Sequence, residues 1–110
     1  MTGADSERFA RAIARFDAAN GEDPNRESDG GGVRPKELLY AERLTAMLAR
    51  FVPEASATLR LAARCQHIQR WKIPRADYPM TRAGYQQWRT RLRDFHAEVA
   101  GAILRDSGYD

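Results

Sequence analysis

Apolar residues recur at intervals of three and four along most of this chain, and residues that favour strands are scarce. Recurrence near 3.6 residues places apolar side chains on one face of a helix. Proline and glycine gather in a few short stretches, which divide the chain into about four main helices. With 110 residues the chain is long enough for a single small domain. The pattern therefore predicts an all-α fold without strands.

Capping residues and helix breakers set the expected bounds of these elements. Serine or threonine before an apolar-periodic run is typical of a helix N-cap, and glycine or proline after the run is typical of its end. The first helix is expected over about 6–20, from Ser6 to a stop at Gly21, and a glycine-rich loop follows over 22–34. A helical core over 35–110 comes next, with further helices expected over 35–51, 56–71 and 81–107.

Each expected helix has an apolar stripe that we expect to face the core. The members of the four stripes are Phe9, Ile13 and Phe16; Tyr40, Leu44, Met47, Leu48 and Phe51; Leu61, Cys65 and Ile68; and Tyr85, Trp88, Leu92, Phe95, Val99 and Ala102. Cys65 is the only cysteine, so no internal disulfide can form. Its apolar neighbours favour a small buried hydrophobic side chain over a reactive thiol.

Charge is distributed unevenly along the chain. Residues 57–93 contain nine Arg and Lys and a single acidic residue, Asp77, whereas residues 1–56 contain eight basic and ten acidic residues. The overall net charge of +3 therefore hides a central segment of +8. Such a segment favours anionic partners, which include a phosphorylated small molecule, a nucleotide or RNA.

The sequence offers no signal for a membrane. No apolar run approaches the roughly 20 residues that a helix needs to cross a bilayer. Residues 1–16 also lack the continuous hydrophobic region of a signal peptide. We therefore expect a cytoplasmic protein without a membrane partner.

Basic and histidine side chains are expected to form two rows that border one groove. A continuous helix over 56–71 would place one row beside its core stripe, and residues spaced seven apart would form a second row on the helix over 81–107. The first row consists of Arg60, Arg64, His67 and Trp71, with Arg70 at its margin, and the second consists of Arg82, Arg89, Arg93 and His96.

Such a groove is suited to a phosphorylated ligand, because guanidinium groups bind phosphate oxygens in pairs. The start of the last helix, with Thr81 and the unobstructed backbone of Gly84, would provide a further seat for an anion. Trp71 and Tyr78 could stack on a nucleotide base. The alternative is that the arginines form a solvated helix face paired with acids elsewhere. The expected phosphate-binding residues are Arg60, Arg64, Arg70, Arg82, Arg89 and Arg93.

The two histidines are candidates for catalysis. His67 and His96 are expected either to act as general acid and base or, together with Glu37, to hold a divalent metal ion. The alternatives are a half-buried, hydrogen-bonded role for each histidine and a helix-dipole role for Glu37 in the first turn of its helix.

Three segments carry a family resemblance. They are RCQHIQRWKIPRADYPMTRAGYQQWR from Arg64, FDAANGEDPN over 16–25 and PKELLYAERL over 35–44. These segments resemble a family of domains of unknown function, the one numbered 4202, and the combination QHIxRWxIPRxxYPxxRxGYxxWR is long and specific. The resemblance covers nearly the whole chain. It implies that the domain is C-terminally incomplete, because matching family members extend beyond residue 110.

Two further segments, LAARCQHIQRW over 61–71 and FHAEVAGAILRDSGYD over 95–110, carry a more distant resemblance. They are similar to parts of the HD-domain phosphohydrolases, helical proteins that hold metal over a phosphoester with a His, a His-Asp pair and a later Asp. Tyr40 stands where the first His is expected, Gln66 and His67 stand where the His-Asp pair is expected, and His96 keeps its type. The resemblance implies an HD-like but degenerate domain.

The leading hypothesis is a degenerate HD-like domain whose basic groove binds a phosphorylated small molecule or nucleotide, and hydrolyses it if a metal enters. One alternative is an RNA-binding accessory module, whose affinity should fall steeply with salt. Another is a non-catalytic interaction domain completed by further helices or by a second copy. That domain should expose apolar surface or form homodimers.

Overall fold

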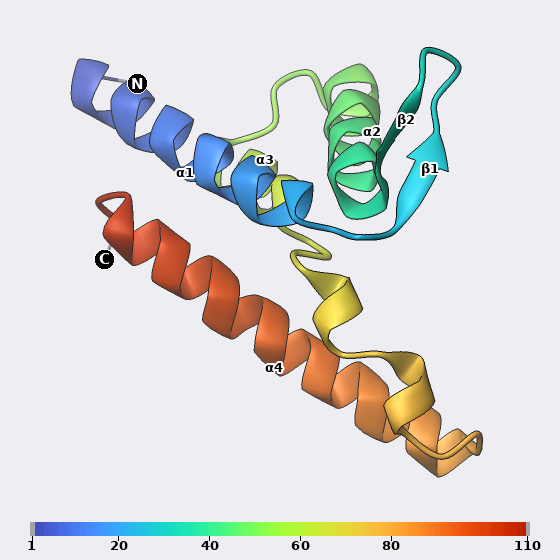
Figure 1. Cartoon of the computed structure of the whole chain (residues 1–110). Coiled ribbons are helices and arrows are strands. Elements are labelled where there is room, and N and C mark those ends of the chain that lie inside the picture. The colour runs from blue at the N-terminus through green and yellow to red at the C-terminus, as the bar shows by residue number, and fades with distance from the viewer. Residues whose placement is uncertain (1, 110) are drawn as a thin grey trace.

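Four α-helices and one short β-hairpin form the described part of the chain, residues 2–109, in the computed structural model (Figure 1). Two 3₁₀ turns, Arg70–Lys72 and Arg75–Asp77, lie between the last two helices. The fold is mostly helical, as predicted, and no described helix is long and apolar enough to cross a membrane. In chain order the elements are α1 (Gly3–Gly21), β1 (Arg26–Ser28), β2 (Val33–Pro35), α2 (Lys36–Phe51), α3 (Ala57–Arg64) and α4 (Arg82–Asp106).

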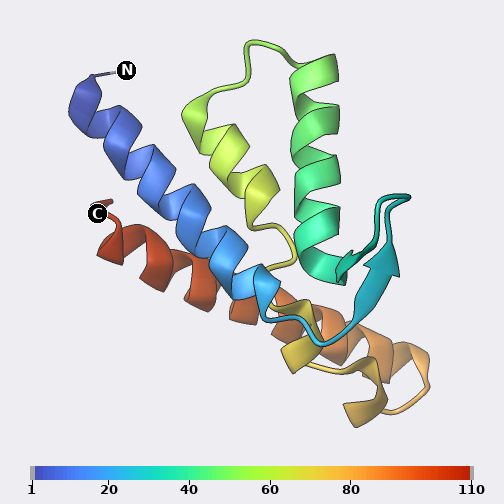
Figure 2. The ribbon, with the colours of Figure 1, turned by 45° about the horizontal axis from the view of Figure 1, so that its top comes forward.

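The two longest helices, α1 and α4, lie side by side, and the start of α1 lies near the end of α4 (Figure 1, Figure 2). Arg11 joins these ends by donating a hydrogen bond of 2.9 Å to the carbonyl of Ser107, and Arg8 lies over the ring of Tyr109 at 4.2 Å. Helices α2 and α3 form a second pair, with the hairpin beside α2 (Figure 2). The segment between α3 and α4 runs back along the N-terminal half of α4 (Figure 1).

The hairpin corrects the expectation of a loop without strands. β1 and β2 pair in antiparallel register, with Glu27 opposite Arg34, and the turn between them has positive φ angles at Gly30 (84°) and Gly32 (151°). Glycine adopts this region at little cost, which is why the run of glycines can close the turn. Strands of three residues are too short for an alternating pattern to be recognised in the sequence.

Two ion pairs attach the hairpin to α2. Arg34 binds both carboxylate oxygens of Glu42, at 2.6 and 2.7 Å, and Arg43 binds Glu27 at 2.9 Å. A bidentate pair of the first kind fixes the orientation of both side chains. The hairpin is therefore held against the first half of α2.

Capping residues predicted the starts of α3, at Ser56, and of α4, but not that of α1. The side chain of Thr81 accepts a hydrogen bond of 3.0 Å from the N–H of Gly84, as expected for the N-cap of α4. Helix α1 begins before Ser6, because Thr2 and Asp5 form a reciprocal capping box that satisfies its first N–H groups.

The helix expected over 56–71 is only half that length in the structure. Helix α3 ends at Arg64, and the chain then turns through Cys65 to Gln69, whose backbone is left-handed at φ 52°. A buried amide holds this turn, because Asn20 of α1 accepts a hydrogen bond of 3.0 Å from the backbone N–H of Gln69. Ile68 is thereby fully buried. The side chains after Arg64 no longer follow the face on which the first basic row was expected.

The core lies where α1, α3 and α4 meet. Cys65 packs against it as a partly buried hydrophobic side chain, and burial raises the pKa of its thiol. On α4 the buried stripe departs from the expected one, because Ala102 is exposed and Tyr85 is 44% exposed. Full burial of a large apolar side chain contributes roughly 1.5–3 kcal/mol, so the meeting point of the three helices stabilises the fold. Its buried members are Ala12, Phe16, Leu61, Ile68, Ala100 and Ile103.

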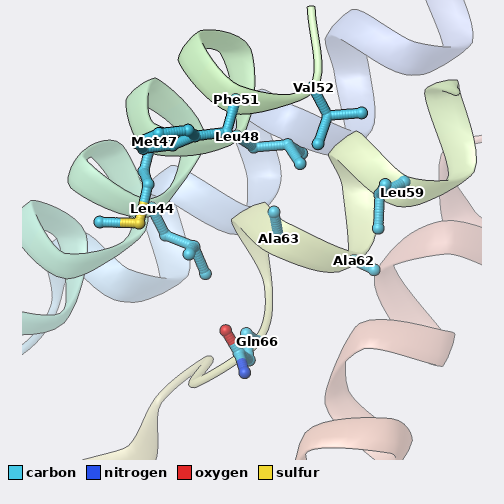
Figure 3. Close-up of a pocket in the computed structure, with 9 residues that line it drawn as sticks. All are labelled: Leu44, Met47, Leu48, Phe51, Val52, Leu59, Ala62, Ala63 and Gln66. Atoms are coloured by element: carbon cyan, nitrogen blue, oxygen red, sulfur yellow. The ribbon is translucent and has the colours of Figure 1, made fainter. Parts of the chain in front are cut away.

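The C-terminal half of α2 is more exposed than its apolar stripe predicts. Met47 and Phe51 are 56% and 70% exposed, so the expectation that they are buried is wrong. They line an open apolar pocket of about 470 Å³ between α2 and α3 (Figure 3). The buried apolar residues of α2 are Leu39 and Ala41, near its start, whereas its later turns face α3 across this pocket and stay partly open to solvent.

Candidate functional site

Both histidines and three arginines line one cleft between α4 and the turns that follow α3. We call this space, which has a volume of about 210 Å³, the cationic cleft. The structure thus brings together residues from both of the expected rows, although not all of them. The turns contribute Gln66, His67 and Arg70, and α4 contributes Arg89, Leu92, Arg93 and His96.

Three of the expected phosphate-binding arginines lie elsewhere. Arg64 binds Asp17 of α1 through two hydrogen bonds of 2.8 Å, and Arg60 lies over an aromatic ring of α1 at 5.8 Å. Arg82 stands at the start of α4, about 10 Å along the helix from Arg89. Arg60 and Arg64 face α1, whereas the turn after α3 moves the later residues of the expected row off that face.

The start of α4 is not the open anion seat that the sequence suggested. The carbonyl oxygen of Pro79 lies against Gly84, at the place that a Cβ atom would occupy. The side chain of Thr81 accepts the hydrogen bond of the Gly84 N–H, and Arg75 donates to the same Pro79 carbonyl at 3.0 Å. The glycine is therefore needed for close packing of the preceding loop, and its backbone is covered.

The two aromatic residues expected to stack on a base are also outside the cationic cleft. Trp71 lines a neighbouring cavity of about 170 Å³ together with Trp88 and Arg70. Tyr78 follows the second 3₁₀ turn, and its backbone carbonyl accepts a hydrogen bond of 3.3 Å from Arg75. Trp71 thus stays close to the cleft through the shared Arg70, whereas Tyr78 does not.

His96 is oriented by a backbone carbonyl. Its Nδ1 lies 2.9 Å from the carbonyl oxygen of Ile68. Because a carbonyl can only accept, Nδ1 carries the proton, and Nε2 of the neutral ring keeps a lone pair. Burial lowers the pKa of His96, the hydrogen bond to Ile68 opposes this shift, and the charges of Arg70 and Arg89 add to it. The neutral ring therefore presents an acceptor at Nε2.

His67 is packed against other rings and is neutral near pH 7. Its ring stacks on Tyr40 with centroids 4.4 Å apart, and its centroid lies 6.0 Å from that of His96. Burial, followed by the charges of Arg70, His96 and Arg89, lowers the pKa of His67 to about 4. Since both imidazoles are uncharged near pH 7, the positive charge of the cationic cleft comes from its arginines.

The arginines of the cationic cleft lack the close carboxylate partners that Arg34 and Arg64 have. Among residues 2–109, no carboxylate oxygen lies within 4.0 Å of Arg70 or Arg89. Arg93 has one carboxylate nearby, that of Asp94 at 3.6 Å, and both side chains are exposed. The guanidinium of Arg70 lies 5.2 Å from the ring centroid of an aromatic residue of α4, a cation–π contact that uses its face rather than its N–H groups. The described lining thus combines three guanidinium groups with no acidic side chain.

Glu37 belongs to an adjoining cavity rather than to the cationic cleft. It stands in the first turn of α2, its Oε1 lies 3.9 Å from Nδ1 of His67, and burial raises the pKa of its carboxyl group. Within the described residues, no three His, Cys, Asp or Glu side chains are arranged so that they could hold a metal ion. The expected metal site of His67, His96 and Glu37 is therefore not supported by the geometry of its donors.

Two buried polar residues that position the site were not singled out in the sequence. Asn20 holds the turn before Arg70 through the N–H of Gln69, and Asp23 accepts a hydrogen bond of 2.9 Å from the N–H of Glu37. Asp23 thereby caps α2, because the residue before this helix is a proline without a side-chain cap. Both residues belong to FDAANGEDPN, the motif that could have pointed to them.

The chain belongs to the family described as Domain of unknown function (DUF4202), whose family model matches residues 10–110. No match was found among curated proteins or among solved structures. The family resemblance drawn from the sequence is thereby confirmed, whereas the likeness to HD-domain phosphohydrolases is not.

Proposed function

We propose that the cationic cleft binds the phosphoryl group of a small phosphorylated molecule. One observation carries this proposal: three guanidinium groups and two neutral imidazoles meet at one cleft whose described lining has no acidic side chain. Guanidinium groups bind phosphate oxygens through paired, charge-assisted hydrogen bonds. A bound phosphate would neutralise the charges of Arg70 and Arg89, which have no carboxylate partner among the described residues.

The histidines would contribute hydrogen bonds rather than charge to the free site. Nε2 of His96 keeps a lone pair while Nδ1 is bound to the Ile68 carbonyl, so Nε2 is suited to accept from the hydroxyl of a phosphate monoanion. A dianion would favour the protonated imidazole, which donates from both nitrogens. The cationic cleft can therefore adapt to both charge states of a phosphomonoester, whose second pKa is about 6.

The proposal is binding and not hydrolysis. General acid catalysis near pH 7 needs a group that is still protonated at that pH. Burial and nearby positive charges lower the pKa of His67 to about 4 in the free cleft, so its imidazole is neutral near pH 7 before a ligand binds and is not poised as a general acid. The carboxyl group of Glu37 lines the adjoining cavity instead of the cationic cleft. A binding role uses the arginines and imidazoles as they stand.

Thermal unfolding in the presence of phosphorylated compounds tests this proposal. The probes are inorganic phosphate, ribose 5-phosphate and adenosine monophosphate, each compared with chloride at equal ionic strength. A ligand that binds only the folded state, at about 100 times its Kd, stabilises the protein by about 2.7 kcal/mol. We expect at least one phosphorylated probe to raise the midpoint of unfolding in a saturable way.

Replacing Arg89 locates the effect. Arg89→Ala should weaken phosphate binding by about tenfold to a hundredfold, because charge-assisted hydrogen bonds contribute about 1.5–3 kcal/mol each. Arg91→Ala is the matched control, since Arg91 stands on the same helix, is paired with Glu98 at 3.3 Å and does not line the cationic cleft. Equal responses of the wild type and both variants to every probe would overturn the proposal.

RNA is the main alternative anion, and the same two variants distinguish it from a small phosphate. An RNA-binding surface spread over the basic segment would lose affinity steeply with rising salt. It would also respond similarly to Arg89→Ala and Arg91→Ala. A phosphate in the cationic cleft should respond to Arg89→Ala alone.

A further inference from the structure

Glu37 is a buried carboxylate without a hydrogen-bond donor among the described residues. Its side chain is 9% exposed, and Nδ1 of His67, at 3.9 Å, is too far away for a hydrogen bond. The backbone N–H of Glu37 is satisfied by Asp23, but no described group donates to its carboxylate oxygens. The side chain is thus mostly buried, yet its carboxylate oxygens are unpaired within the described residues and face an open cavity, where a ligand can donate to them.

The carboxylate of Glu37 opens into a cavity that adjoins the cationic cleft. His67 and Arg70 line both spaces and form a wall common to them. A phosphoryl group in the cationic cleft and a group bound at Glu37 would therefore be neighbours, separated only by these two side chains. The adjoining cavity has a volume of about 450 Å³ and is lined by Glu27, Lys36, Glu37, Tyr40, Arg43, His67 and Arg70.

The two volumes indicate how a ligand would divide between the spaces. Small-molecule sites usually have volumes of about 300–1,000 Å³. The cationic cleft, at about 210 Å³, is below that range and suits one phosphoryl group rather than a whole ligand. The adjoining cavity, at about 450 Å³, falls within the range. The phosphoryl group would occupy the first space and the remainder of the ligand the second.

We infer that Glu37 binds adjacent hydroxyl groups of the same ligand, which is then a phosphorylated polyhydroxy compound such as a sugar phosphate or a ribonucleotide. This inference rests on the proposed function. A carboxylate has two acceptor oxygens and so matches a pair of neighbouring hydroxyls. Burial raises the pKa of Glu37 by removing water from its charged form. Hydroxyl donors of a ligand would replace that water.

Charge in the adjoining cavity favours hydroxyls over an amine as the group that meets Glu37. Arg43 is already paired with Glu27 at 2.9 Å. This pairing leaves Lys36 and Arg70 beside a single carboxylate in the described lining. A protonated amine would enter a space with net positive charge, whereas a neutral diol would not be repelled.

Isothermal titration calorimetry of the full chain tests the inference with ribose 5-phosphate, 2-deoxyribose 5-phosphate and inorganic phosphate. Glu37→Gln keeps the size of the side chain and removes its charge. We expect this variant to bind ribose 5-phosphate about tenfold more weakly, the scale of one hydrogen bond to a charged group. Its affinity for inorganic phosphate should be unchanged or slightly higher, because a nearby negative charge is gone. Wild-type protein should bind the 2-deoxy sugar more weakly than ribose 5-phosphate.

The outcomes separate the role of Glu37 from phosphate binding itself. Ribose 5-phosphate binding that is equal in the wild type and in Glu37→Gln, but is lost in Arg89→Ala, would contradict the inference about Glu37. The same result would still support phosphate binding in the cationic cleft. If no phosphorylated probe binds the wild type, both are wrong. Equal affinity of the wild type for the two sugars would also contradict the inference, and this comparison does not depend on whether a variant folds.

Discussion

Replacing Asp23 with alanine should lower the free energy of unfolding by about 3 kcal/mol. Asp23 is 1% exposed, and its carboxylate accepts hydrogen bonds of 2.9 and 3.0 Å from the backbone and side chain of Asn25 and one of 2.9 Å from the N–H of Glu37. Alanine removes the acceptor of all three and leaves the first turn of α2 without a cap. A buried donor left unpaired costs about 1–3 kcal/mol.

Urea denaturation followed by circular dichroism measures this change. Asp23→Asn is the control, because asparagine keeps one carbonyl oxygen as an acceptor and should lose less stability than alanine. An Asp23→Ala protein as stable as the wild type would mean that the N–H of Glu37 finds another acceptor. Asp23 would then not be what fixes the start of α2 beside the candidate site.

Phe16→Ala should have the largest effect of any core substitution considered, at about 3–5 kcal/mol. Phe16 is fully buried where α1, α3 and α4 meet, in one cluster with Leu61, Ile68 and Ile103. Alanine would leave a cavity among three helices, and a close-packed interior closes such a cavity only in part. The loss would reach the site, because Ile68 belongs to the turn that carries its neighbour His67.

Phe51→Ala is the matched control for Phe16→Ala. It is the same substitution, but Phe51 is 70% exposed beside the apolar pocket between α2 and α3 (Figure 3), so stability should change by less than about 1 kcal/mol. Thermal unfolding of the two variants makes the comparison. Similar losses would mean that Phe51 is covered in solution, as a homodimer or an interaction partner would require. A homodimer and an interaction partner both remain predictions made from the sequence.

Elements that depend on local signals were predictable from the sequence. Pro35 stands directly before α2 and Thr81 directly before α4, and both signals act within one helical turn. The start of α1 was missed because Thr2 and Asp5 form a more complete cap than Ser6 would. The hairpin was missed because its strands are too short to show alternation.

The break after α3 could not be predicted from local sequence. Residues 65–71 continue the apolar spacing of a helix, and the first proline after α3 is Pro74. The left-handed turn at Gln69 depends instead on Asn20, which lies 49 residues earlier in the chain and binds its N–H. A contact of that range is set by tertiary packing, and it decided which of the expected basic residues reach the cationic cleft.

The candidate site was therefore predictable in part. Arg89 and His96 stand on a regular helix, so their common face followed from their spacing. His67 and Arg70 reach the same cleft through the turn after α3 and not along the face of a continuous helix. Glu37 was considered only as a metal ligand or a first-turn residue, because burial without a hydrogen-bond donor becomes visible only in three dimensions.

The central claim is that a phosphoryl group binds in the cationic cleft, and the two imidazoles report on it directly. His67 and His96 are the only histidines in the chain, and both line the cleft. Nuclear magnetic resonance of the imidazole side chains therefore observes this site alone. In a titration with ribose 5-phosphate we expect both imidazole signals to shift saturably and the pKa of His67 to rise from about 4, because a bound anion favours the protonated ring. Imidazole signals and pKa values that stay unchanged throughout the titration would contradict the claim.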